Sequence, residues 1–369
     1  MFGPPARTMS RVLVGLFVAI VGSAADCIPA PQRSYSDEQP AEIHKRAERG
    51  YQEQQIELAA AYLIGRGVTQ DYALAAKWYE KAAGTGSPEA QIQIGYLYEY
   101  GIGVRADADR ALRWFQLASA SGLPLAKVNV GVCYLKGLGV RENASTAKEL
   151  FLQAASKGSG LGAAYLGLME YFGLGTPIDK SGAEKWFALG ERLNDPIAGY
   201  ILASLYAKGE GSAHDQRRIF KLLRSSSKGG YVAAKHTLGL LLLKHPDMVE
   251  SDHEPRILLE EASNAGNWRS SAALAMMARD GMTMETDVSQ AYYYFHLAGL
   301  QGGPAARQLL ERDFRNLSQR VSKQEQKALA ARADAWFRQH RVPLIFVLND
   351  SFSGQNFPVV AGTQPYSLE

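Results

Sequence analysis

The stretch that decides the fold is residues 88–122, PEAQIQIGYLYEYGIGVRADADRALRWFQLASASG. Its first part, Pro88–Tyr100, has small and apolar residues at helical spacing. Gly101–Gly103 then stops the helix, because the turn needs backbone angles that glycine adopts cheaply. Asp107 stands where a helix N-cap is wanted, and a second helix is predicted over residues 108–121. The stretch therefore predicts two helices joined by a short glycine turn.

The same pattern returns every 36 residues. Four kinds of position recur: paired turn glycines, caps, aromatic residues and helix-ending glycines. The paired turn glycines are Gly65/Gly67, Gly101/Gly103, Gly137/Gly139, Gly173/Gly175 and Gly209/Gly211, and the caps are Asp71, Asp107, Asn143, Asp179 and Asp215. The aromatic residues are Trp78, Trp114 and Trp186, and the helix-ending glycines are Gly86, Gly122, Gly158, Gly230, Gly266 and Gly302. No insertion or deletion breaks this register. One hairpin cannot bury its own apolar face, so the units must stack. The predicted fold is all-α, a right-handed α/α superhelical solenoid of about seven 36-residue helix-turn-helix repeats, with the first helix of each repeat on the concave side.

The later units depart from the pattern. Unit six has His245-Pro246 where the first turn glycine belongs, and unit seven keeps Gly281 but has Thr283 in place of the second. A last pair of helices, near 304–312 and 323–340, is interpreted as a C-terminal cap.

The recurring positions resemble the Sel1-like repeat family, relatives of the tetratricopeptide repeats. Unit two carries that family's pattern in Ala90, Ile94, Gly95, Tyr98, Gly101, Gly103, Val104, Asp107, Ala111, Trp114, Phe115, Ala118 and Gly122. The resemblance covers residues 45–310 and implies adaptor work, such as assembling membrane-associated or periplasmic complexes, supporting polysaccharide export, or signalling. One branch of the family resembles β-lactam-binding enzymes and has a cysteine pair in each repeat. This chain has only Cys27 and Cys133.

The N-terminus has the three parts of a secretory signal. Arg7 and Arg11 precede the apolar run 12–21, which is too short to span a bilayer, and small residues follow at 23–25. Cleavage after residue 25 and a periplasmic or secreted location are predicted. A retained membrane anchor is the alternative. Lipoprotein anchoring at Cys27 is disfavoured, because Asp26 stands where such patterns carry a small residue.

The predicted organisation has five parts. They are a signal peptide (1–25), a Pro-rich linker (26–43), the repeat array (44–303), capping helices (304–340) and an extended or disordered tail (341–369). The net charge is only +3, and no large basic tract indicates a nucleic-acid partner.

No catalytic, cofactor or metal site is predicted. The Gly-x-Gly elements follow helices and lack the rest of a phosphate-binding motif. Ser145–Lys148 and Ser225–Lys228 match the short Ser-x-x-Lys pattern of penicillin-recognising enzymes, but no Lys-Thr-Gly or Ser-Asp-Asn accompanies them. His245, Asp247, Glu250, Asp252 and His253 crowd one connector without a recognised ligand spacing. Cys133 is interpreted as a small buried residue.

A tentative binding groove is predicted on the first helices of the repeats. Exposed aromatic residues beside charges are typical of an interface centre, and ordinary packing between repeats is the alternative. The candidates are Tyr96, Glu99, Tyr100, Lys136, Tyr171, Phe172 and Lys208. The leading functional hypothesis is an exported scaffold, without enzymatic activity, that binds protein partners through its concave face. Two alternatives remain: a cell-wall or β-lactam-active enzyme of the Sel1-repeat type, and a carbohydrate-binding support protein in polysaccharide secretion.

Overall fold

The computed structural model describes residues 40–212, 215–282 and 285–339. This part of the chain is built of 17 α-helices and one short 3-10 helix, and it contains no strand.

Each repeat contributes a first helix (A) and a second helix (B). The A helices are α3 (Gln52–Ile64), α5 (Pro88–Tyr100), α7 (Pro124–Lys136), α9 (Gly160–Phe172), α11 (Pro196–Ala207), α13 (Val232–Lys244) and α15 (Trp268–Asp280). The B helices are α4 (Tyr72–Gly84), α6 (Ala108–Ala120), α8 (Ala144–Ser156), α10 (Lys180–Arg192), α12 (Gln216–Lys228), α14 (Glu254–Asn264) and α16 (Val288–Gln301). Three helices flank this series: α2 (Pro40–Glu48), α17 (Gly303–Ser318) and α18 (Lys323–Gln339). The predicted all-α repeat solenoid is confirmed.

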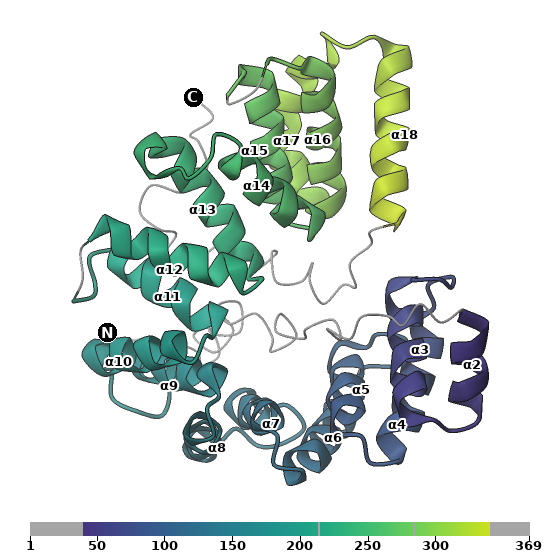
Figure 1. The fold of residues 1–369 in the computed structure, drawn as a ribbon, viewed down its shortest axis with the longest axis vertical. Coiled ribbons are helices and arrows are strands. Elements are labelled where there is room, and N and C mark those ends of the chain that lie inside the picture. Colours follow the sequence, from purple (N-terminus) through teal and green to yellow (C-terminus); the bar gives the residue numbers. More distant parts are fainter. Residues whose placement is uncertain (1–39, 213–214, 283–284, 340–369) are drawn as a thin grey trace, which may run out of the picture. The chain divides into compact units, whose positions relative to one another are not determined.

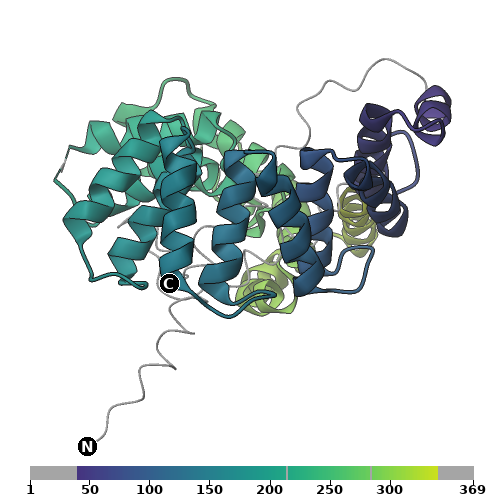
Figure 2. The same ribbon diagram turned by 90° about the horizontal axis from the view of Figure 1, so that it is seen from below.

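The described residues fall into two compact units, 40–198 and 199–339, with the division inside α11. In the first unit, Figure 2 shows the helices standing side by side in a row. Figure 1 shows α5 and α7 on the inner side of this row and α6 and α8 on the outer side. The A helices α7 and α9 also contact each other directly. In this unit the A helices therefore line the concave side, as predicted.

In three hairpins of the first unit, a buried ring of the B helix lies on a glycine of the A helix. In α6 this ring is that of Phe115, which is 1% exposed, and a Cβ added at Gly95 of α5 would lie 2.5 Å from its ring. The pairs Gly131–Phe151 and Gly167–Phe187 repeat the arrangement at 2.6 and 2.7 Å. Only a glycine lets the two helices approach this closely, so the ring and the glycine together set the spacing inside a repeat.

The turn glycines have two separate roles. Gly101 ends α5 in the left-handed conformation (φ 68°), and its N–H donates to the carbonyl of Leu97. Gly103 also has a positive φ, and a Cβ there would overlap the backbone of Tyr72 at the start of the preceding B helix. The first glycine therefore closes one hairpin, whereas the second allows it to dock against its neighbour.

The predicted caps are confirmed at every B helix where they were expected. The side chain of the cap residue accepts a hydrogen bond from a backbone N–H in the first turn of the helix. This holds for Asp71, Asp107, Asn143, Asp179 and Asp215, and also for Asp287, which the sequence analysis did not name.

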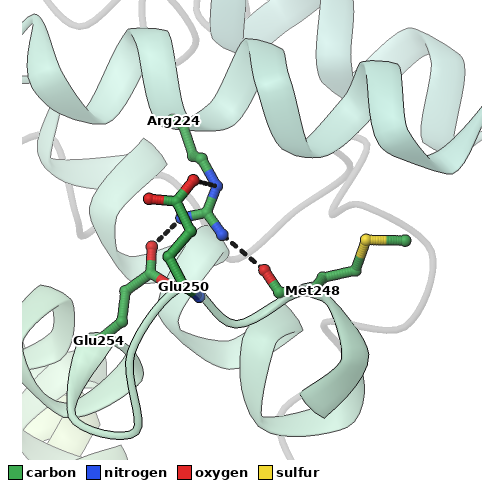
Figure 3. A network of polar contacts seen from close by, with 4 residues as sticks. All are labelled: Arg224, Met248, Glu250 and Glu254. Atoms are coloured by element: carbon green, nitrogen blue, oxygen red, sulfur yellow. Dashed lines mark hydrogen bonds and ion pairs between the residues drawn. The ribbon is translucent and has the colours of Figure 1, made fainter.

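Unit six keeps its hairpin although the turn glycine is missing. His245 ends α13 with φ −126°, and the 3-10 helix η2 (Pro246–Met248) follows. Arg224 of α12 holds this connector. It donates to the carbonyl oxygen of Met248 (2.6 Å) and pairs with the carboxylates of Glu250 (3.2 Å) and Glu254 (Figure 3). Ionic contacts from the preceding repeat thus replace the conformational role of the glycine.

The helices at the two ends depart from the predicted boundaries. Residues 40–43, predicted as linker, belong to α2, whose Ile43 and Ala47 pack with Leu58. The helix predicted over 304–312 is longer in the structure, because α17 runs over residues 303–318, and α18 begins at residue 323 as predicted. The predicted signal peptide, most of the linker and the tail lie outside the described residues.

The last helix, α18, packs on α16. Tyr293 and Leu297 of α16 are buried together with Ala333 of α18, and the guanidinium of Arg332 lies 4.1 Å from the ring centre of Tyr293. Nε2 of His296 lies 3.5 Å from a carboxylate oxygen of Asp334. This helix therefore covers the B helix of the last repeat.

Trp114, one of the aromatic residues that recur with the repeat, is not the residue that fills the core. Trp114 is only half-buried, whereas the next residue, Phe115, is among the largest fully buried side chains. The two positions are one residue apart on the helix, so about 100° of rotation separates the core-facing ring from the flanking ring.

We expect Phe115→Ala to lower the free energy of unfolding by about 3–5 kcal/mol, because it removes a fully buried ring. Trp114→Ala serves as the matched control and should cost about 1–2 kcal/mol, because that ring is only partly buried. Urea denaturation of both variants measures the difference. Equal losses for the two variants would contradict this assignment.

Candidate binding surface

Four of the predicted groove residues lie on the neighbouring A helices α5 and α7. Tyr96 and Asn129 form the deepest contact between these helices. The hydroxyl of Tyr96 donates to Oδ1 of Asn129 at 2.9 Å, and both residues are 2% exposed. Burial raises the pKa of Tyr96 well above its ordinary value, so the phenol stays neutral and acts as the donor. The prediction that Tyr96 is an exposed groove residue is therefore wrong, since its ring fills the space between repeats.

Glu99 and Lys136 form an ion pair between the same two helices. The carboxylate oxygen of Glu99 lies 4.0 Å from Nζ of Lys136, and their side chains are 12% and 9% exposed. Burial raises the pKa of Glu99, although Lys136 and a hydrogen bond from Tyr100 oppose this shift. Burial also lowers the pKa of Lys136, against the attraction of Glu99. Each charge is thus poorly solvated and depends on the other.

The remaining aromatic candidates lie at the ends of A helices. Tyr100 is the last residue of α5, and Tyr171 and Phe172 are the last two of α9. The rings of Tyr171 and Phe172 meet edge to face with centroids 4.8 Å apart, and Nζ of Lys180 lies 5.5 Å from the centre of the Tyr171 ring. These three aromatic side chains are half-buried, so each keeps part of its surface open to a ligand.

We call the ends of α5, α7 and α9 that carry these side chains the α5–α7–α9 surface. It comprises Glu99, Tyr100, Lys136, Tyr171 and Phe172. The three helices adjoin in the first unit: Glu99 of α5 pairs with Lys136 of α7, and α7 contacts α9 directly. Lys208 follows α11, is exposed and belongs to the second unit.

The contacts between A helices follow a rule that sequence spacing alone could suggest. Tyr96 and Asn129 are 33 residues apart, and Glu99 and Lys136 are 37 apart. Both separations lie close to one 36-residue repeat, because equivalent faces of successive A helices meet. Searching for complementary polar residues near one repeat length would have found both pairs, including Asn129, which the sequence analysis did not name.

The other sequence candidates lie elsewhere. Ser145 is exposed in the first turn of α8, and Ser225 is exposed in the last turn of α12. In the connector of unit six, His245 lies within 3.0 Å of the amide of Gln216, and Glu250 pairs with Arg224. Within the described ranges, no group of three or more His, Cys, Asp or Glu side chains could hold a metal ion. Burial raises the pKa of Cys133 to about 12, which keeps the thiol protonated.

The geometry defines the class of protein: an all-α solenoid of tandem helical hairpins. The Sel1 repeat family matches six segments of the sequence: residues 55–84, 88–123, 124–159, 161–195, 196–231 and 269–303. These segments cover more than half of the chain, and the chain therefore belongs to the Sel1 repeat family. The hairpin α13–α14 lies outside them, in the repeat that lost its turn glycine. Sel1 repeat proteins typically mediate protein–protein interactions, and their solenoid is generally a non-enzymatic scaffold.

Solved structures similar to this chain include three bacterial proteins. A protective antigen of uropathogenic Escherichia coli with an SLR fold is 22% identical, with 87% of this chain and 76% of that chain covered and a TM-score of 0.42. A Sel1 repeat protein from Oxalobacter formigenes is 26% identical, with coverages of 60% and 94% and a TM-score of 0.46. An immunity protein from Pseudomonas aeruginosa is 16% identical, with coverages of 61% and 83% and a TM-score of 0.39. No curated protein matches the sequence significantly.

None of the helices in the described part of the chain has the length and apolar character needed to cross a membrane.

The Glu99–Lys136 pair predicts strongly non-additive effects on stability. Lys136→Met alone should cost about 3–5 kcal/mol, because it leaves a buried carboxylate without its partner. The loss should be larger at pH 8 than at pH 5, because a carboxyl whose pKa is raised in the folded state loses stability as the pH rises through that pKa. The double variant Glu99→Gln/Lys136→Met should recover most of the loss. Urea denaturation at both pH values measures this cycle, and additive losses would show that the two charges do not depend on each other.

Proposed function

We propose that this protein is an exported scaffold that holds protein partners through the α5–α7–α9 surface of its first unit. Membership of the Sel1 repeat family supports the interaction role. The single observation that supports this particular surface is the largely buried ion pair Glu99–Lys136 beside the partly open ring of Tyr100. Aromatic side chains next to weakly solvated charges are typical of the centre of a protein interface.

The recurring residues of the repeat support a division between scaffold and binding. Turn glycines, caps and core rings each have a structural partner, as Gly95 and Phe115 do. The A-helix ends differ from one repeat to the next: Tyr100, Lys136 and Phe172 occupy equivalent positions. Function in repeat arrays comes from such variable side chains on the concave face. No convergent set of nucleophile and base lies among the described residues of this surface, and we propose that the protein binds without catalysis.

The test of the binding surface is the double variant Tyr100→Ala/Tyr171→Ala. Each aromatic anchor in an interface centre contributes about 2 kcal/mol or more, so the variant should lose the partners that the parent protein captures from its own envelope. Tyr51→Ala, at a tyrosine that is 57% exposed outside the surface, is the matched control and should keep them. The identified partners, the helical circular dichroism and the melting temperature are compared among the three proteins.

Two results would contradict the binding proposal. Unfolding of the double variant would show that these tyrosines are core residues. A folded variant that still captures every partner would move the site away from this surface. Capture of polysaccharide rather than protein by the parent would favour the carbohydrate-binding alternative.

The export part of the proposal rests on the basic start, apolar run and small residues of segment 1–25. A fusion of residues 1–30 to a reporter that is active only outside the cytoplasm should be active and processed after Ala25. A control fusion with Leu16→Arg and Phe17→Arg should be silent, because charges interrupt the apolar run. A silent, uncleaved parent fusion would overturn export.

A further inference from the structure

The B helix α12 carries an unusual excess of positive charge. Its sequence, QRRIFKLLRSSSK, has five basic residues and no acidic one. Phe220, Leu222 and Leu223 are buried and fix the helix in the array. The apolar face of α12 is thus already buried in the array. The basic side chains are therefore not the polar half of a helix whose apolar face is free to bind elsewhere.

Three of the five basic side chains form an open stripe. Arg224 is neutralised by Glu250 and Glu254 in the network of Figure 3, and Arg218 also has a partner. The remaining three, Arg217, Lys221 and Lys228, are exposed, and no ion pair ties them to another described side chain. Spacings of four and seven residues return to the same helix face, so the three charges lie in one line about 16 Å long. We call this line the α12 stripe.

The repeat does not require charges at these positions. In the other B helices the three equivalent positions carry other combinations: Ala73, Lys77 and Gly84; Asp109, Arg113 and Ala120; Ser145, Glu149 and Ser156; Ser181, Lys185 and Arg192; His253, Ile257 and Asn264; Ser289, Tyr293 and Leu300. Only α12 has a cation at all three. In a repeat array, residues that differ from unit to unit at one position are those that scaffold packing leaves free.

The chain itself shows what can bind to this face of a B helix. On α16 the equivalent positions are occupied by Ser289, Tyr293 and Leu300, and α18 covers them. That contact combines apolar packing with polar pairs, including the hydroxyl of Ser289 donating to Glu325. The outer face of a B helix in this array is thus able to receive one further α-helix along its length.

We propose that the α12 stripe is a second interaction surface, which docks an acidic α-helix of a partner protein. The partner helix would carry carboxylates spaced like the three cations and would lie along α12 as α18 lies along α16. This surface is independent of the α5–α7–α9 surface, which belongs to the first unit.

The geometry of α12 favours a narrow partner. The three cations of the stripe lie in a single line along one helix face, and a single helix is about 10 Å wide, so one partner helix can contact all of them. The carboxylates of the next B helix, α14, do not neutralise the stripe, because they are paired elsewhere: Glu254 with Arg224, Glu260 with Arg256 and Glu261 with Lys235.

The test uses the full-length protein and a defined probe. The probe is a 17-residue alanine-rich helical peptide with three glutamates at i, i+4 and i+11, compared with peptides that carry glutamine or lysine at the same places. The parent protein should bind the glutamate peptide about tenfold more tightly than the glutamine peptide at low salt, and the preference should shrink as salt is added. Fluorescence anisotropy measures the affinities.

Charge exchange provides the decisive comparison. The variant Arg217→Glu/Lys221→Glu/Lys228→Glu should lose the glutamate peptide and prefer the lysine peptide instead. The control Lys185→Glu/Arg192→Glu, which reverses two exposed charges at equivalent positions of α10, should bind like the parent. If charge reversal perturbs folding, Arg217→Gln/Lys221→Gln/Lys228→Gln removes the stripe with a smaller change and should abolish the preference.

Three outcomes would overturn the proposal. One is that the parent shows no preference for the glutamate peptide. A second is that the α10 control loses binding as much as the α12 variant does, which would show that the effect depends only on net charge. Stripe-dependent binding to vesicles containing phosphatidylglycerol, without binding to the peptide, would assign the stripe to membranes.

Discussion

The close approach of a buried B-helix residue to a small A-helix residue is the constraint on which the rest of the structure depends. Phe115 on Gly95 fixes the distance between the helices of one hairpin, and Phe151 and Phe187 repeat it. In α14 the B-helix residue is Leu259, and the facing A helix again has a glycine. A Cβ added at Gly239 would lie 2.8 Å from the side chain of Leu259. Because the same close approach recurs in these hairpins, they can stack with a regular offset.

A constant offset brings the same helix face of successive repeats together, and this is what makes a binding surface possible. Side chains separated by about one repeat length become neighbours, as Glu99 and Lys136 do. A buried ion pair of this kind contributes little net stability, because desolvation offsets the attraction. Its location beside the partly open ring of Tyr100 is the observation on which the proposed binding surface rests.

The array also shows how a repeat can lose a defining residue and keep its place. Unit six has no turn glycine, and the sequence profile of the family does not match it. Its connector is held from outside by Arg224 of the preceding repeat. The same helix exposes Arg217, Lys221 and Lys228, so α12 combines a structural contact through Arg224 with an exposed charged stripe.

The sequence by itself determined the period, the hairpins, the turns and the caps, because each depends on local backbone chemistry that recurs with the repeat. It placed Asp107 as a cap and ended α5 at Tyr100 correctly. Only the tertiary structure decided that Phe115 rather than Trp114 fills the core, and that Tyr96 is buried whereas Tyr100 stays partly open. Neighbouring residues of an α-helix point about 100° apart, and the position of the facing helix decides which of the two is buried.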